Sequence, residues 1–278
     1  MVEKTLLIEL FQPFAQYRNP FTFYYAQTYP SPPKSTVIGM LQNALGDWYG
    51  NEWGIDKWWN LKVSVHGGFE SVFWNYQQLI KATKTGISIV YFKGRPTLWN
   101  QDAPLYPFKD FPITSQRTPV IQQELFNGWL YILLKGENDF LREIKEALTT
   151  PTKVLSLGRS EDVVFVRRVE FIDGVEKTAR EIAIIYPTYV SAPLELLKKT
   201  EYPTYSIPIR VIFKNDGKPV KHKAEISQET FRDVEFKPVI YVGSWKYLKF
   251  KEKVTLEEYA IGDVKLKVVN DEQATGWL

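Results

Sequence analysis

Residues 71–120 combine cations and aromatic rings in a way that suits contact with a single-stranded nucleic acid. Only two acids, Asp102 and Asp110, fall in this window. Cations reach phosphates, and rings such as Trp74 and Tyr91 stack on bases. The same composition also fits an ordinary solvated hairpin with an aromatic underside, so both interpretations stay open. The six cations of the window are Lys81, Lys84, Lys93, Arg95, Lys109 and Arg117.

A second candidate site lies at the start of an expected helix. Lys34 and Ser35 follow a proline-rich stretch, and residues 30–46 contain no acid. The free N–H groups and the dipole at a helix start favour a bound phosphate. Simple capping of the helix by Ser31 is the alternative interpretation.

The third candidate is the short turn at residues 157–162. Gly158 permits a positive φ angle or a close backbone approach. Arg159 and Ser160 then offer hydrogen-bond donors to a phosphate. A turn held by a local salt bridge is the alternative.

Residues for acid–base or metal chemistry are scarce. The chain has no cysteine and only two histidines, His66 and His222. This composition excludes disulfides and thiolate metal sites, and it disfavours a Ser-His-Asp triad or a multi-histidine metal centre. No glycine-rich phosphate cradle is present. We therefore expect no cofactor and no metal. A single histidine could still serve as the general base of a metal-free ribonuclease.

The elements that position these residues can be read from periodicity and turn residues. The sequence predicts a strand over 4–11 and an amphipathic helix over 34–46 that ends at Gly46. Strands over 61–80 follow, with a bulge or bend at Gly67-Gly68. A strand over 86–92 and a long loop over 93–116 complete the first half of the chain.

The second half begins with two expected strands in 117–135, joined by a turn at Asn127-Gly128. A helix over 138–149 comes next, capped by Asn138 or Asp139, and strands follow over 152–171. The order β-α-β-excursion-β-α-β predicts an α+β protein with a ferredoxin-like (RRM-like) domain over 1–170. A thumb-like hairpin excursion would occupy about 75–120, and a smaller β-rich domain would occupy 171–278.

Charge and hydropathy place the chain in a broad class. The net charge is +3 over 278 residues, so any nucleic-acid surface must be a local patch. Glu9 interrupts the apolar run near the N-terminus, and the longest apolar stretch elsewhere, 129–134, is too short to span a membrane. We expect a cytoplasmic protein without membrane contact.

Three of these segments together resemble one family. Residues 29–46, with the core YPSPPKSTVIGML and a closing Leu45-Gly46, resemble the first-helix signature of the CRISPR-associated family five (Cas five) proteins. These are members of the RAMP superfamily and subunits of type I Cascade complexes. Arg117-Thr118-Pro119, followed by Glu124, resembles the return strand of the family's thumb. Residues 157–161 resemble its glycine-rich loop.

The resemblance implies a subunit that holds the 5′ handle of CRISPR RNA. Its partners would be this RNA, the adjacent Cascade backbone subunit and the large subunit. The RNA would meet residues of all three motifs and of the thumb. These predicted RNA-binding residues are Arg18, Lys34, Ser35, Lys81, Lys84, Arg95, Arg117, Arg159 and Ser160.

Some members of the family, those of subtype I-C systems, cut precursor CRISPR RNA with a tyrosine and an adjacent Lys-His pair. The only Lys-His step here is Lys221-His222, in the wrong third of the chain for that motif. We therefore expect a non-catalytic subunit, with a metal-independent endoribonuclease as the alternative. An aromatic-rich carbohydrate-binding protein is a third hypothesis, supported only by the number of aromatic residues.

Overall fold

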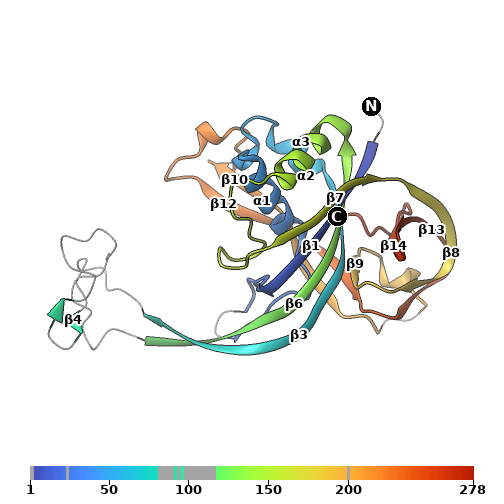
Figure 1. Ribbon diagram of the computed structural model, residues 1–278, viewed down its shortest axis with the longest axis horizontal. Helices are drawn as coiled ribbons and strands as arrows, with labels where there is room; N and C mark the ends of the chain where they lie inside the picture. The colour runs from blue at the N-terminus through green and yellow to red at the C-terminus, as the bar shows by residue number, and fades with distance from the viewer. Residues whose placement is uncertain (1–2, 23–24, 81–90, 93–94, 97–116, 199–200) are drawn as a thin grey trace. The chain divides into compact units, whose positions relative to one another are not determined.

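The computed structural model describes residues 3–22, 25–80, 91–92, 95–96, 117–198 and 201–278 (Figure 1). It is an α+β structure in which strands predominate. The helices and short 3₁₀ turns are α1 Lys34–Leu45, η1 Trp48–Gly50, α2 Ile55–Asn60, α3 Asn138–Thr149, η2 Leu194–Leu196 and η3 Lys223–Glu225. The strands are β1 Glu3–Ala15, β2 Tyr25–Ala26, β3 Lys62–Ile80, β4 Tyr91–Phe92, β5 Arg95–Pro96, β6 Arg117–Glu137, β7 Phe165–Ile172, β8 Gly174–Ile184, β9 Thr188–Val190, β10 Thr204–Asn215, β11 Lys218–Pro219, β12 Phe231–Val242, β13 Lys246–Ile261 and β14 Val264–Val269.

The chain divides into two compact units. One contains residues 1–18, 28–73 and 124–278, and the other contains 19–27 and 74–123. The second unit takes in the predicted excursion, where the expected strand 86–92 and loop 93–116 lie mostly outside the described residues. The expected boundary at residue 170 stays a prediction. In the part that the structure describes, no helix is long and apolar enough to cross a membrane.

The largest sheet has the strand order β11-β10-β12-β9-β3-β6-β1-β7, with β2 added to β6. Strand β1 lies between β6 and β7 and is antiparallel to both. A separate sheet joins β8, β13 and β14. Figure 1 shows α1, α2 and α3 grouped on one side of β1 and β6, while β8, β13 and β14 curve round on the other.

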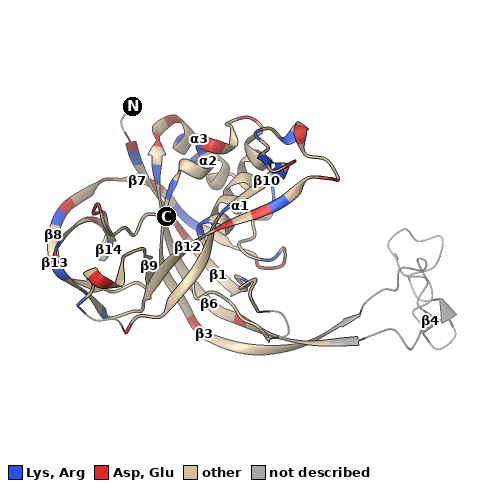
Figure 2. Cartoon of the chain, turned by 180° about the vertical axis from the view of Figure 1, so that it is seen from behind, with Lys and Arg blue, Asp and Glu red and all other residues tan. Residues whose placement is uncertain are grey.

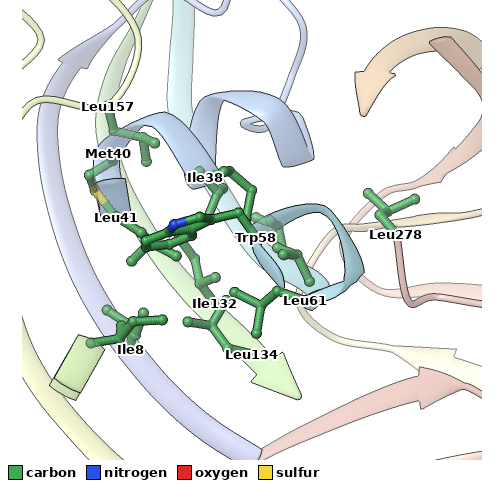
Figure 3. Close-up of a cluster of buried hydrophobic side chains, with 14 of the residues drawn as sticks. Ile8, Ile38, Met40, Leu41, Trp58, Leu61, Ile132, Leu134, Leu157 and Leu278 are labelled. Atoms are coloured by element: carbon green, nitrogen blue, oxygen red, sulfur yellow. The ribbon is translucent and has the colours of Figure 1, made fainter. Parts of the chain in front are cut away.

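The main core follows from strand alternation. Leu6, Ile8 and Leu10 of β1 point to the helices and are fully buried. Trp58 of α2 lies in the centre of this core beside Ile38 of α1 and side chains of β6 (Figure 3). Its indole Nε1 donates to Asp47 Oδ2 at 2.7 Å, which satisfies the polar end of a ring that is otherwise buried in apolar surroundings.

On the opposite face of the same sheet, β9 and β12 pack against β8 and β13, and β1 and β6 are covered where β1 begins. Leu7 of β1 and Leu133 of β6 pack there against Tyr259 of β13 and against Val268 and Trp277. Tyr259, Val268 and Trp277 belong to the C-terminal part of the chain. The sheet is therefore enclosed on both faces where β1 begins.

Two features differ from the expectations for 117–135 and for the helix caps. Strand β6 is continuous, because it pairs with β1 from Glu137 to Leu125; the predicted hairpin turn at Asn127-Gly128 is wrong. Asn127 adopts its positive φ of 56° inside the strand instead. The predicted side-chain caps are also wrong: α1 begins after Pro33 and α3 after Glu137, both without a side-chain cap. Gly46 ends α1 with a φ of 76°, as expected.

Gly67 marks the expected irregularity of β3, but within one continuous strand. Its φ is 99°, and a Cβ built on it would lie 2.1 Å from the carbonyl oxygen of Trp129 in β6. Only glycine allows the two backbones to come this close.

His66, the next residue back in β3, is 2% exposed, and its Nε2 lies 3.0 Å from Ser64 Oγ. Burial lowers the pKa of His66 to about 3. The imidazole is therefore neutral at pH 7.

The close approach at Gly67 predicts a large loss of stability on adding one methyl group. Gly67→Ala should lower the free energy of unfolding by about 3 kcal/mol, from the clash and the positive φ together. Gly39→Ala is the matched control, since Gly39 lies in α1 and the added methyl carbon would have no atom beyond the neighbouring helix backbone within 4 Å. That change should stabilise by about 0.5–1 kcal/mol. Urea unfolding measures both; equal effects would contradict the assignment.

Buried His66 predicts a specific acid sensitivity. Between pH 6.5 and about 3 the unfolded chain binds a proton that the folded chain excludes, so stability falls as the pH falls through this range. Relative to a His66→Gln variant, the wild type should lose about 1.4 kcal/mol per pH unit. Unfolding curves from pH 7 to pH 4 measure the difference, with His222→Gln as the control for removing one imidazole. Parallel losses in wild type and His66→Gln would refute it.

Candidate nucleic-acid interface

The segment before α1 is fixed by a buried tyrosine. Tyr189 of β9 donates from its hydroxyl to the carbonyl oxygen of Ser31 at 2.8 Å, and the Ser31 N–H donates back to the same hydroxyl at 3.2 Å. Burial raises the pKa of Tyr189 well above its usual value, so the hydroxyl keeps its proton. Ser31 is thus a buried anchor that sets where α1 begins, rather than the helix cap expected from the sequence.

Lys34, the first residue of α1, is buried at 6% exposure, and its Nζ donates to the carbonyl oxygen of Trp59 at 2.8 Å. Burial lowers the pKa of Lys34 to about 8, and the nearby charges of Arg210 and Lys237 act in the same direction. Ser35 beside it is half-buried. A phosphate contact at Lys34 would require the ammonium to turn from Trp59, so this lysine is less available than the sequence suggests.

Arg210 of β10 and Lys237 of β12 join Lys34 to form what we call the α1 basic cluster. Burial also lowers the pKa of Lys237. Glu235 is the acid of this region: its Oε2 lies 3.7 Å from Arg210 Nε. Basic and acidic segments interleave on β10 and β12 (Figure 2). The cluster therefore holds three cations near one carboxylate, which favours a bound anion.

Arg210 and Lys237 are not recognisable as members of the cluster from the sequence, for a physical reason. Each sits in a strand of mixed composition more than 170 positions from Lys34. They reach α1 only because β10 pairs with β12 and α1 packs on β10. No local pattern carries that information.

The Gly158 turn closes around the buried carboxylate of Asp162, which is 1% exposed. Its Oδ2 accepts the backbone N–H of Arg159 at 2.8 Å and that of Gln16 at 2.9 Å. Gly158 has a φ of 118°, and a Cβ there would lie 2.7 Å from Asp162 Oδ2. The expectation of a glycine needed for close approach is confirmed.

Arg159 is fully engaged by carboxylates. Its Nη2 lies 2.8 Å from Asp162 Oδ1, and its Nη1 lies 2.9 Å from Glu124 Oε1 in β6. Burial alone would lower the pKa of Arg159, but the hydrogen bonds to Asp162 and Glu124 outweigh it and raise the value. Arg159 therefore secures the turn in this structure. Ser160 is exposed, with its Oγ donating to Glu161 at 3.1 Å.

Tyr17 links the turn to the start of α1. Its hydroxyl donates to Gln12 Oε1 at 2.5 Å, and Gln12 Nε2 donates to the carbonyl oxygen of Leu157 at 2.7 Å. The carbonyl oxygen of Tyr17 accepts the N–H of Tyr29 at 2.8 Å. Because Arg159 also reaches Glu124, the three motifs singled out in the sequence meet in one hydrogen-bonded network.

The remaining predicted RNA-binding residues fall in different places. Arg18 is exposed and follows Tyr17, so it lies beside the Gly158 turn. Arg95 is in β5 and Arg117 begins β6, but their side chains are outside the described part. Lys81 and Lys84 lie outside the described residues altogether. RNA contact at all of these positions stays a prediction.

The two histidines lie in contrasting environments. His66 is enclosed in β3, as described above. His222 is exposed, and its neighbour Lys221 pairs with Asp56 at 2.6 Å. Among the described residues, no three carboxylate or imidazole side chains gather as a metal site would require.

Comparison with solved structures gives low similarity. A chain of a "CRISPR RNA-guided surveillance complex" aligns with a TM-score of 0.49 and 13% identity, over 88% of this chain and 90% of that one. A CRISPR protein from Archaeoglobus fulgidus gives 0.39 and 11%, over 96% and 98%. A chain of the type III-B Cmr-beta complex bound to cognate target RNA gives 0.37 and 11%, over 86% of each chain.

No curated protein matches the sequence. The model of one protein family, described as CRISPR-associated protein (Cas_Cas5), does match, and it spans residues 5–244. This range contains all three linked motifs and the α1 basic cluster. The chain therefore belongs to the CRISPR-associated Cas_Cas5 family.

Proposed function

We propose that this chain is a non-catalytic CRISPR RNA-binding subunit of a type I Cascade complex, which holds the 5′ handle of the guide RNA. The α1 basic cluster carries the proposal. It brings three cations to the start of a helix, within the family-matched range. Family membership supplies the biological context, and the cluster supplies the chemistry for a phosphate backbone.

The energetics of the cluster favour an anion. Lys34 and Lys237 have lowered pKa values because burial disfavours their protonated forms, and at Lys34 the like charges nearby add to this. A phosphate placed among them would offset both effects. The N-terminal end of α1 would add its own positive potential. RNA binding and full protonation of the lysines should therefore reinforce each other.

The fold is consistent with this role. The strands β3-β6-β1-β7, with α1 and α3 packed on one face, have the order of a ferredoxin-like (RRM-like) domain. The excursion between β3 and β6 would serve as the thumb. We expect the adjacent backbone subunit, the large subunit and the RNA 5′ handle as partners, in the cytoplasm. The predicted contacts at Arg18, Ser35, Lys81, Lys84, Arg95, Arg117 and Ser160 belong to the same proposal.

Two observations favour a holding role over cleavage. His66 is enclosed and neutral at pH 7, so it has no path to a substrate proton. His222 is exposed; of the two lysines that flank it, Lys221 is paired with Asp56 and Lys223 lies over the Trp48 ring. The endoribonuclease alternative therefore rests on His222 alone.

Lys237→Gln should weaken handle binding. Losing one phosphate contact predicts affinity roughly tenfold lower and a salt slope smaller by about one. Filter binding of labelled handle RNA from low to moderate KCl measures both quantities. Arg232→Gln is the matched control, because Arg232 is an exposed cation on the same strand. If Lys237→Gln and wild type bind equally at every salt concentration, the cluster does not contact RNA.

Incubation with CRISPR-repeat RNA in EDTA should shift the RNA on a native gel and leave it intact on a denaturing gel. The reason is that His66 is enclosed, while exposed His222 lies between Lys221, which is paired with Asp56, and Lys223, whose ammonium lies 5.6 Å from the centre of the Trp48 ring. His222→Gln should behave as wild type. A shorter product that disappears in His222→Gln, but persists in Arg232→Gln, would establish the endoribonuclease alternative instead.

A further inference from the structure

Three aromatic rings form a row across β6, β1 and β7, beyond the part of β1 that the C-terminal residues cover. Phe11 of β1 is the strand partner of both Trp129 in β6 and Phe165 in β7. The Phe11 ring lies 5.1 Å from the Trp129 ring and 6.2 Å from the Phe165 ring, centroid to centroid. Trp129 and Phe165 are 45% and 49% exposed. We call Phe11, Trp129, Phe165 and the nearby Arg167 the aromatic platform.

The platform is not an extension of the core. It occupies the face of β1 opposite the helices, the same face on which Leu7 is covered by Tyr259 and Trp277. That cover ends before Phe11. Large rings left exposed side by side on a sheet mark a surface that binds something.

A β-bulge supplies the platform with a cation. The register of β7 against β1 shifts between Glu9 and Leu10, so Arg167 is the extra residue of β7. Its guanidinium lies 5.6 Å from the centre of the Phe11 ring and 5.9 Å from that of Trp129. Arg168 pairs with Glu9 and Glu170. Within the described part of the chain, Arg167 has no carboxylate at salt-bridge distance.

A groove of about 550 Å³ continues from the platform along the outer side of β7. It is lined by the end of α3, by Pro151 and residues 153–155, and by residues 163–169. Lys153, Arg167 and Arg168 contribute to its wall, and none of the lining residues is acidic. Phe165 and Arg167 belong to both the groove and the platform, so rings and cations adjoin.

We propose that the platform and groove bind unpaired nucleotides of a single-stranded RNA. This deepens the proposed function, on which it rests, by naming a second RNA contact that runs from the aromatic platform to the groove along β7 and the end of α3. A base stacks on the exposed rings of Trp129 and Phe165, and the flanking phosphates meet Arg167 and Lys153. Stacking on rings accepts any base, so the contact is tolerant of sequence. None of the residues that line the groove is acidic, and among the described residues Arg167 has no carboxylate at salt-bridge distance. These cations therefore favour a polyanion as the occupant.

The two parts of the contact can be separated by their salt dependence. Phe165→Ala should weaken binding of an oligouridine of about eight nucleotides by roughly tenfold, with an unchanged salt slope. Arg167→Gln should reduce the salt slope by about one. An abasic oligomer of the same length should bind wild type and Phe165→Ala equally, because it has no base to stack. Matched controls are Phe231→Ala and Arg232→Gln, which alter an exposed ring and an exposed cation of β12.

The outcomes distinguish this proposal from the one on which it rests. If handle RNA binds wild type and loses affinity in Lys237→Gln, while Phe165→Ala and Arg167→Gln match wild type on both RNAs, the platform proposal is overturned and the proposed function stands. If neither RNA binds wild type, alone or assembled with its partner subunits, both fail. If the platform variants bind RNA normally but lose a protein partner from the assembled complex, the platform is a protein interface and the RNA proposal is overturned. Circular dichroism of each variant checks that the fold is intact.

Discussion

The carboxylate of Asp162 is the constraint on which the interface depends. A buried charge must be compensated by hydrogen bonds and an opposite charge. Here the compensation comes from the backbone just after β1, at Gln16, and from Arg159 in the turn itself. The turn can satisfy Asp162 only when it lies against the end of β1. The need of the buried Asp162 carboxylate for hydrogen-bond partners thus fixes the position of the turn and of the exposed residues beside it.

Tyr17 extends this constraint to the rest of the site. Its hydroxyl donates to Gln12, which itself bonds to Leu157 of the turn, and its carbonyl oxygen accepts the N–H of Tyr29. Ser31 and Tyr189 then hold the lead into α1. The basic residues lie next to these hydrogen bonds. The polar groups that make the bonds already have partners within the network. Such a network can present cations without using their charge to hold the chain together, except at Arg159 and Lys34.

Sequence reasoning succeeded where the determining forces are local. The helix 34–46, its end at Gly46, and the need for glycine at position 158 follow from periodicity and backbone sterics. It failed at Asn127-Gly128. Asn127 does adopt a positive φ, but β6 continues to pair with β1 on both sides of it, so no turn forms. Sequence reasoning offered Ser31 as a helix cap, and for Arg159 it offered both a phosphate contact and a local salt bridge. The partners Tyr189 and Glu124, which engage these two residues, come from distant segments.

The long reach of the network has a consequence for how the protein is made. Gln12 bonds to Leu157, 145 positions later, and the cluster at α1 needs Lys237. Chains emerge from the ribosome N-terminus first, and contacts of such separation are slow to close. The opening strand is therefore released long before its partner turn exists. The α1 basic cluster is completed only after about six-sevenths of the 278 residues have been synthesised, so a nascent chain lacks this group of cations for most of its synthesis.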